Sequence, residues 1–263
     1  MRRLEEYFSK TSMIISVREF CLAGVFLTRL PFSISKKVKD GELAESSWAF
    51  PLVGVLVGLI GGIVYLAVNK CNLNSLICAG LSIFVITIVT GAIHEDGLAD
   101  TIDGLGGGGD RHQKLKIMRD SFIGSYGVLS LIFSVIFRWL GLAQFSGPET
   151  AVVGLVISGS MSRSILPIIP CFFRSARNDG LGFDLGRPSM RVALTSLLFG
   201  AIFCVIFLGL IDAILIIGVL LVVTVIFLLL VCRQIGGYTG DVLGACQQIG
   251  EIIILVLVWL SIS

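Results

Sequence analysis

Charged residues are scarce in this sequence. Asp, Glu, Lys and Arg make up only 14% of its 263 residues, whereas about 25% is usual for a soluble domain. Apolar residues reach 55%, and the mean hydropathy is +0.96. Because a protein this apolar lacks the polar side chains that cover a water-facing surface, the composition excludes a soluble globular enzyme and a disordered chain. The small net charge of +2, with no basic stripe, also excludes a nucleic-acid-binding protein.

Cysteine motifs are lacking as well. The seven cysteines are odd in number, form no CxxC pair and mostly lie in or beside apolar runs. This excludes a disulfide framework and a zinc site, and we interpret the cysteines as small packing residues. Arg18, Glu19 and Arg29 interrupt the first apolar stretch, so we expect no cleavable signal peptide.

Long apolar runs dominate the rest of the chain. A membrane-spanning helix needs about 20 mostly apolar residues, and we expect six or seven such helices. The runs cover residues 51–68, 75–93, 128–145, 151–173, 192–211, 213–232 and, as the shortest, 252–262. Residues 13–34 carry two arginines and a glutamate, which favours a helix at the membrane interface. The sequence thus predicts an all-α, polytopic integral membrane bundle that forms a single domain over residues 1–263.

The basic residues predict the orientation of this bundle. If the N-terminus is cytoplasmic, seventeen of the twenty Lys and Arg residues lie on the cytoplasmic side. Lys70 alone lies outside, and Arg138 and Arg163 lie within spans. By the positive-inside rule, the N-terminus and the sizeable loops face the cytoplasm.

A third of the scarce acids concentrate after the second predicted span. They are Glu95, Asp96, Asp100, Asp103, Asp110 and Asp120. Asp96, Asp100 and Asp103 have the spacing i, i+4, i+7, which places them on one face of a helix. Because like charges on one face repel, a divalent cation is the expected counter-charge, and Mg²⁺ often takes one or two carboxylates plus substrate phosphates. The spacing does not distinguish Mg²⁺ from Mn²⁺, and the alternative is a solvated loop face.

Glycine and basic residues follow the acids. The glycines at 106–109 are expected to end the acidic helix and to form either a phosphate cradle or a plain flexible loop. Residues 110–121 predict a short amphipathic helix. The basic side chains of this helix would contact a substrate that carries phosphates. Lys114 and Lys116 are equally consistent with a role as anchors at the membrane surface.

Two further features carry polar groups. An arginine at the bilayer centre costs at least about 2.5 kcal/mol, and Arg163 lies in a polar stretch in the cytoplasmic half of its span. We expect Arg163 to bind phosphate, with a structural pairing to an acid as the alternative, and Arg138 to be structural. Residues 236–246 form a glycine-dense loop in which Thr239 and Asp241 either approach a ligand or cap a turn.

These residues resemble a known family, the cobalamin synthases or adenosylcobinamide-GDP ribazoletransferases. The main block is HEDGLADTIDG at residues 94–104. Further matching blocks lie at residues 26–31, 50–54, 117–121, 123–127 and 236–241. Gln247 and Gln248 depart from the acidic character that we expect after the last block.

The resemblance implies a reaction. Such enzymes join adenosylcobinamide-GDP to α-ribazole or its 5′-phosphate and release GMP. They require Mg²⁺ and reside in the bacterial inner membrane, so the lipid bilayer is a further expected partner. The resemblance leaves open whether the protein forms homo-oligomers. The residues singled out above take these roles: Glu95, Asp96, Asp100 and Asp103 as Mg²⁺ ligands; Arg119, Arg163, Thr239 and Asp241 in substrate binding; and His94 or Asp120 as the base that takes the hydroxyl proton.

Two other classes remain as alternatives. A CDP-alcohol phosphotransferase also uses an Asp-rich helix, but its signature has Ala-Arg after the first Asp-Gly pair, where this chain has Leu98 and Ala99. A metal or corrin transporter usually places ionisable groups near the midplane, often within internal repeats. Here the acids follow a span, and no repeat is evident.

Overall fold

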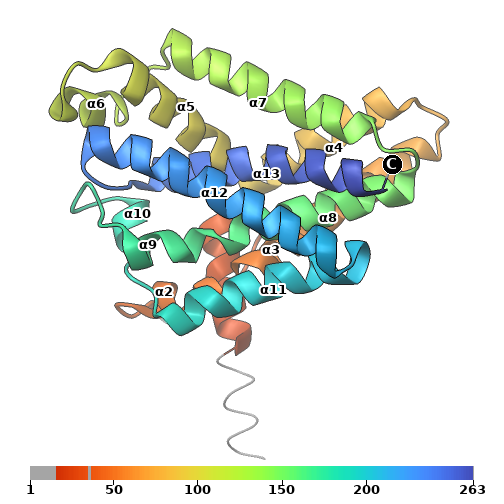
Figure 1. The fold of residues 1–263 in the computed structure, drawn as a ribbon, viewed down its shortest axis with the longest axis horizontal. Coiled ribbons are helices and arrows are strands. Elements are labelled where there is room, and N and C mark those ends of the chain that lie inside the picture. Colours follow the sequence, from red (N-terminus) through yellow and green to blue (C-terminus); the bar gives the residue numbers. More distant parts are fainter. Residues whose placement is uncertain (1–15, 35–36, 263) are drawn as a thin grey trace, which may run out of the picture.

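The computed structural model describes residues 16–34 and 37–262, and helices account for the regular structure of this part of the chain (Figure 1). The long helices are α3 (Phe50–Asn69), α4 (Ser75–Thr90), α7 (Ser125–Ala143), α8 (Pro148–Ser164), α11 (Met190–Leu208), α12 (Leu210–Ile235) and α13 (Gly240–Ile262). Shorter elements are α2 (Glu42–Ser46), η1 (Ser47–Ala49), α5 (Ile93–Gly107), α6 (Arg111–Ile117), η2 (Leu166–Ile168), α9 (Ile169–Phe172) and α10 (Leu181–Asp184). Within the described residues there is no β-strand, which confirms the predicted all-α class.

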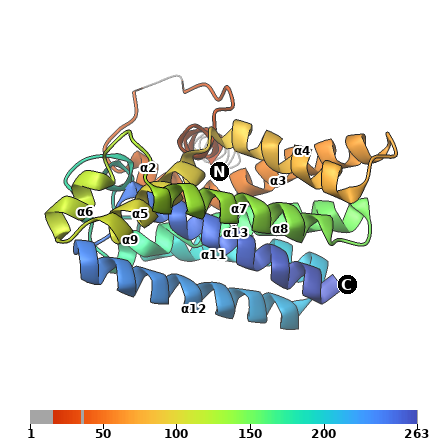
Figure 2. The ribbon, with the colours of Figure 1, turned by 90° about the horizontal axis from the view of Figure 1, so that it is seen from above.

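Six helical segments are long and apolar enough to cross a membrane, and a seventh results if α4 and α5 count as one broken span. The predicted number of spans is therefore confirmed. The long helices run roughly alongside one another, whereas α5, α6, α9 and α10 gather near one end of the bundle (Figure 2). The turn between α3 and α4 lies at the other end of the bundle. The loops after α5, before α11 and before α13, which the positive-inside rule assigns to one side of the membrane, therefore lie together at the end opposite that turn.

Small residues let the central helices approach closely. A Cβ atom added at Gly58 of α3 would lie 2.5 Å from the carbonyl oxygen of Leu155 on α8, and one at Gly54 would overlap the backbone of Gly159. Close backbone approach at small residues is how membrane helices associate, since lipid supplies no hydrophobic driving force between them. The pair α3–α8 thus forms the centre of the bundle.

The N-terminal apolar segment is helical over residues 16–27, and residues 13–15 of the predicted interfacial helix lie outside the described residues. This helix packs on α3 and the turn before it. The rings of Phe26 and Phe50 stack at 5.6 Å, and the Trp48 indole donates to Glu19 at 2.7 Å.

Two helix boundaries differ from the prediction. The span predicted over 75–93 ends at Thr90, because Gly91 and Ala92 both adopt left-handed conformations, with φ of 65° and 56°, and the chain turns by 87° into α5. α13 begins at Gly240 rather than near residue 252. The polar side chains in the first half of α13 lower its hydropathy, so the apolar pattern indicated only its second half. These side chains are buried inside the protein and do not interrupt the helix.

The glycine run also ends α5 later than expected. The helix continues through Gly107. Gly106 lies so close to Tyr126 that an added Cβ would be 2.7 Å from its ring. Tight packing on α7 therefore offsets the low helix propensity of these glycines.

Candidate active site

The acid-bearing helix α5 crosses the first turns of α13 at two glycines. A Cβ at Gly97 would lie 2.7 Å from the carbonyl oxygen of Asp241, and one at Gly244 would lie 3.2 Å from the Cα of His94. The two backbones are therefore in direct contact. This contact brings Asp96 and Asp241, far apart in the sequence, to the wall of one pocket.

This pocket, which we call the acidic pocket, has a polar and an apolar part. His94, Asp96 and Asp241 supply the polar part. The apolar part is lined by Phe26, Leu27, Phe50, Ile93, Leu166, Leu181 and Leu243. The side chain of His94 is buried, and neither ring nitrogen has a hydrogen-bond partner among the described residues. The pocket thus joins two carboxylates to an apolar wall, with the buried His94 beside them.

The predicted acidic face of α5 is partly assembled in this pocket. Asp100 lies within electrostatic range of Asp96, Asp103 and Asp241. Asp103 is engaged elsewhere, since its two carboxylate oxygens accept the backbone N–H groups of Gly124 at 2.7 Å and Gly127 at 2.8 Å. These donors belong to the start of α7, where a carboxylate caps the helix and suits its dipole. Asp103 therefore fastens α5 to α7 beside the pocket.

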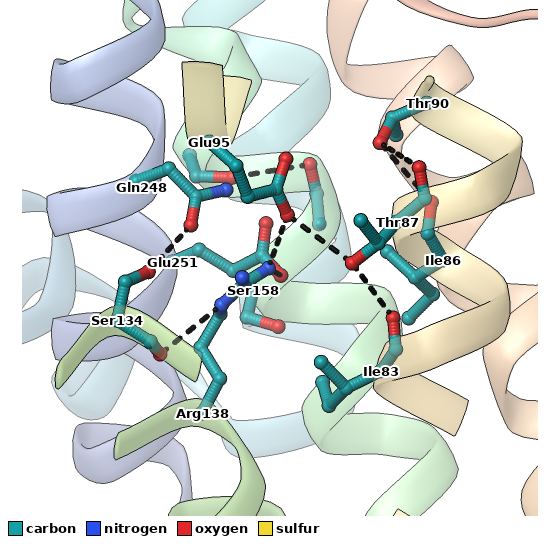
Figure 3. A network of polar contacts seen from close by, with 12 residues as sticks. Ile83, Ile86, Thr87, Thr90, Glu95, Ser134, Arg138, Ser158, Gln248 and Glu251 are labelled. Carbon is teal, nitrogen blue, oxygen red and sulfur yellow. Dashed lines mark hydrogen bonds and ion pairs between the residues drawn. The ribbon is translucent and has the colours of Figure 1, made fainter. Parts of the chain in front are cut away.

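Glu95 points away from the acidic pocket, contrary to our expectation that it joins the other carboxylates. Because neighbouring residues on a helix point about 100° apart, Glu95 faces the bundle interior while Asp96 faces the pocket. Its Oε1 lies 2.9 Å from Nη1 of Arg138 on α7 and accepts from Thr87 Oγ1 at 3.3 Å (Figure 3). The expected structural role of Arg138 agrees with this pairing.

The same buried network contains residues of α13 that sequence reasoning missed. Glu251 lies 3.7 Å from Arg138 Nη1 and 3.8 Å from Arg163 Nη1. Gln248 accepts from Ser134 at 2.7 Å. The signal for Glu251 was present in the sequence, because an ionisable residue inside an apolar helix needs a partner.

Arg163 belongs to this network rather than to the acidic pocket. Its Nη1 donates to the carbonyl of Gly159 at 2.9 Å and its side chain is almost completely buried. This arrangement departs from the predicted phosphate-binding role and matches the alternative, a structural partner for an acid.

Arg177 supplies the positive charge at the acidic pocket, and sequence reasoning did not single it out. Its Nη1 lies 3.3 Å from Asp241 Oδ2, and its Nη2 donates to the carbonyl of Leu115 at 3.0 Å. Burial lowers the pKa of the Arg177 guanidinium, and the Asp241 carboxylate opposes that shift. Thr239 donates to Asp241 at 3.1 Å and accepts from Val242 N at 3.3 Å, so Thr239 both orients Asp241 and caps α13.

A basic groove adjoins the acidic pocket through Arg177. It lies between α6 and the segment before α10, and its lining includes His112, Lys116, Arg119, Arg177 and Asn178. Arg119 pairs with Asp179 at the exposed side of this groove. The short amphipathic helix predicted over residues 110–121 is present as α6, which ends earlier, at Ile117. It is capped by the Asp110 side chain, which accepts from Gln113 N at 2.9 Å.

Asp120 lies apart from the acidic pocket. It is exposed, and its carboxylate accepts the backbone N–H of Phe122 at 3.1 Å within a turn. Of the two bases considered, His94 alone lines the pocket.

The carboxylates fit a metal ion that is shared with a substrate. No three His, Cys, Asp or Glu side chains of the described residues converge into a ready-made metal cluster. Asp96 and Asp241 nevertheless line one pocket, with Asp100 in electrostatic range. Mg²⁺ commonly binds through one or two carboxylates, substrate phosphates and retained waters, and hard oxygen donors of this kind meet that requirement.

Curated relatives match the chain over nearly its whole length. Adenosylcobinamide-GDP ribazoletransferase of Bradyrhizobium diazoefficiens is 40% identical over 241 residues, covering 92% of this chain and 93% of the relative. The enzyme of the same name from Mesorhizobium japonicum is 38% identical, covering 93% of this chain and 94% of the relative. That from Shewanella baltica is 35% identical, covering 89% of this chain and 90% of the relative.

No solved structure matches this chain. The family model described as cobalamin-5-phosphate synthase matches residues 19–259. This chain therefore belongs to the cobalamin-5-phosphate synthase family.

Proposed function

We propose that the protein transfers the adenosylcobinamide-phosphate group of adenosylcobinamide-GDP to α-ribazole, or to its 5′-phosphate, and releases GMP. The relatives' shared name supports this activity. The observation that carries it is the acidic pocket, with its unpaired His94, placed directly beside a groove of basic side chains. A phosphoryl transfer needs this combination of charge stabilisation and positioning.

The chain's own residues divide the chemistry between them. A ribose hydroxyl of the acceptor attacks the phosphorus attached to cobinamide; the new O–P bond forms as the bond to the GMP oxygen breaks. His94 takes the hydroxyl proton, because it is a lining residue of the pocket and its buried ring nitrogens have no hydrogen-bond partner among the described residues. Arg177, Arg119 and Lys116 bind the diphosphate oxygens in the basic groove. Asp96, Asp100 and Asp241 would hold Mg²⁺, which would supply positive charge to offset the charge on the leaving GMP.

The protein is proposed to lie in the bacterial inner membrane with its N-terminus and active-site end in the cytoplasm. The asymmetry of Lys and Arg supports this orientation. Both substrates would then reach the site from the cytoplasm, the compartment that contains nucleotides.

The test is GMP formation by purified protein from adenosylcobinamide-GDP, α-ribazole and Mg²⁺. Asp96→Asn should lower turnover by about a hundredfold or more, since it removes a charge at the reacting phosphate. Asp212→Asn is the matched control, because Asp212 lies in the first turn of α12, away from the acidic pocket, and it should retain turnover. Near-normal turnover of Asp96→Asn would contradict the assigned role of Asp96, and the absence of GMP from the wild-type reaction would contradict the function.

A further inference from the structure

A second cavity, lined by arginine and aromatic side chains, lies near α9 and α10 (Figure 1), and the proposed reaction does not use it. We call it the arginine cavity. Its lining comes from residues within 170–175 at the end of α9, residues within 183–187 at the end of α10, and Tyr238 before α13. Its volume of about 380 Å³ falls within the range of small-ligand sites, about 300–1,000 Å³.

The two arginines of this cavity are each held by one backbone carbonyl. Nε of Arg174 donates to the carbonyl of Gly236 at 3.2 Å, and Nη2 of Arg187 donates to the carbonyl of Cys171 at 2.8 Å. Among the described residues neither arginine forms an ion pair, and no Asp or Glu lines the cavity. Since a guanidinium carries five N–H donors, most donors of both side chains remain available to an anionic ligand.

The arginine cavity lies where two candidate membrane spans end. The span that contains α8 and α9 ends at Phe172, and the span formed by α11 begins at Met190. Arg174 follows the first of these spans and Arg187 precedes the second. Phe172 and Phe183, which also line the cavity, are 69% and 48% exposed. Basic cavities between membrane helices bind lipid head groups, and exposed apolar side chains beside them suit the acyl region.

The arginine cavity is separate from the groove proposed for the donor. Two hydrogen bonds, from Ala176 N to the Tyr238 carbonyl at 2.7 Å and from Tyr238 N to the Arg174 carbonyl at 3.0 Å, fix the segment between them. Arg174 lines the arginine cavity, whereas Arg177 lines the basic groove and contacts Asp241. The two arginines therefore belong to different cavities although they lie close in sequence.

We infer that the arginine cavity binds the head group of an anionic phospholipid from the surrounding bilayer. The lipid phosphate lies between Arg174 and Arg187, and the acyl chains run along the exposed rings of Phe172 and Phe183. Two arginines without a carboxylate partner select a head group with net negative charge over a zwitterionic one. Such a lipid ties the segment between α9 and α11 to the membrane surface, whether or not the protein catalyses the proposed reaction.

The test is native mass spectrometry of the full-length protein in detergent, with phosphatidylglycerol and phosphatidylcholine of the same acyl chains supplied in equal amounts. Each basic side chain near a membrane surface strengthens binding of an anionic lipid about fivefold. With two arginines, the wild type should bind one phosphatidylglycerol about thirtyfold more tightly than phosphatidylcholine. Equal retention of the two lipids would overturn the inference.

Charge variants locate the bound lipid. Arg174→Gln/Arg187→Gln should abolish the preference for phosphatidylglycerol, whereas Arg174→Lys/Arg187→Lys keeps both charges and should retain most of it. Arg233→Gln is the matched control, since Arg233 is an exposed arginine in the last turn of α12, outside the cavity, and it should bind lipid as the wild type does. A preference that survives in the glutamine variant, or that is lost in the lysine variant, would contradict the assigned site.

Two further measurements separate a lipid from a soluble phosphate. Inorganic phosphate in millimolar excess should leave the bound phosphatidylglycerol in place, because the acyl chains contribute to its binding. Displacement by inorganic phosphate would indicate a site for a soluble anion and overturn the lipid assignment. So would a KM for adenosylcobinamide-GDP that rises about tenfold in the glutamine variant while its lipid preference is unchanged, since the cavity would then bind the donor.

Discussion

At the scale of single residues, the buried charges beneath the active site balance one another. Arg138 contacts both Glu95 and Glu251, and Arg163 contacts Glu251. Arg138→Gln leaves two carboxylates with one arginine, and breaking a buried pair costs about 3–5 kcal/mol. We expect a clearly lower thermal stability in detergent, measured with a thiol-reactive dye that reports exposure of the buried cysteines.

The double variant Arg138→Gln/Glu95→Gln removes one charge of each sign, so it should be more stable than Arg138→Gln alone. Arg119→Gln is the control, because its pair with Asp179 is exposed and such pairs contribute about 0–1 kcal/mol. If Arg138→Gln lowers the unfolding temperature no further than Arg119→Gln, the network contributes little to stability.

The sequence predicted which carboxylates lie at the acidic pocket better than it predicted the positions of Glu95 and Arg177 next to them. Helical spacing placed Asp96 and Asp100 on one face, and the glycine-dense segment pointed to Asp241. Spacing alone does not say which face of α5 meets another helix, so Glu95 was assigned to the pocket although it points inward. Arg177 was missed because its contact with Asp241 joins residues 64 positions apart, which no local pattern reveals.

At the scale of elements, the crossing of α5 and α13 determines the geometry of the site. In Gly97→Ala the added Cβ would lie 2.7 Å from the carbonyl oxygen and 3.0 Å from the Cα of Asp241, so the helices must move apart. A displacement of about 1 Å can cost a hundredfold in rate. We expect turnover to fall by about that factor in the GMP assay while the protein remains folded.

Gly218→Ala is the control for this change. Gly218 lies in α12, and a Cβ added there meets nothing within 4 Å. Because alanine favours a helix over glycine by up to about 1 kcal/mol, this variant should be at least as stable as the wild type and fully active. Equal turnover of the two variants would show that the close crossing is dispensable.

The apolar runs predicted most helices because a span is a local property of composition. They failed at α13, whose buried face carries Gln247, Gln248 and Glu251. Hydropathy averages around the helix and does not register that these polar groups contact one another rather than lipid. The corner at Gly91 and Ala92 was missed because a left-handed alanine has no sequence signature.

At the scale of the whole molecule, one cysteine reports the orientation. Cys71 lies in the turn between α3 and α4, at the end opposite the acidic pocket, and is the exposed one of the seven cysteines. A membrane-impermeant maleimide should therefore label intact spheroplasts, and Cys71→Ser should remove that labelling. Labelling that appears only after the membrane is opened would reverse the proposed orientation.

The contact between α5 and α13 also has a consequence for biosynthesis. More than 130 residues separate the end of α5 from the start of α13, and a chain emerges from the ribosome N-terminus first. The carboxylates of α5 are thus made long before Asp241, and Arg138 and Arg163 enter the bilayer before Glu251. Catalytic competence is acquired only when the last helix inserts, so a nascent or truncated chain that lacks α13 is inert.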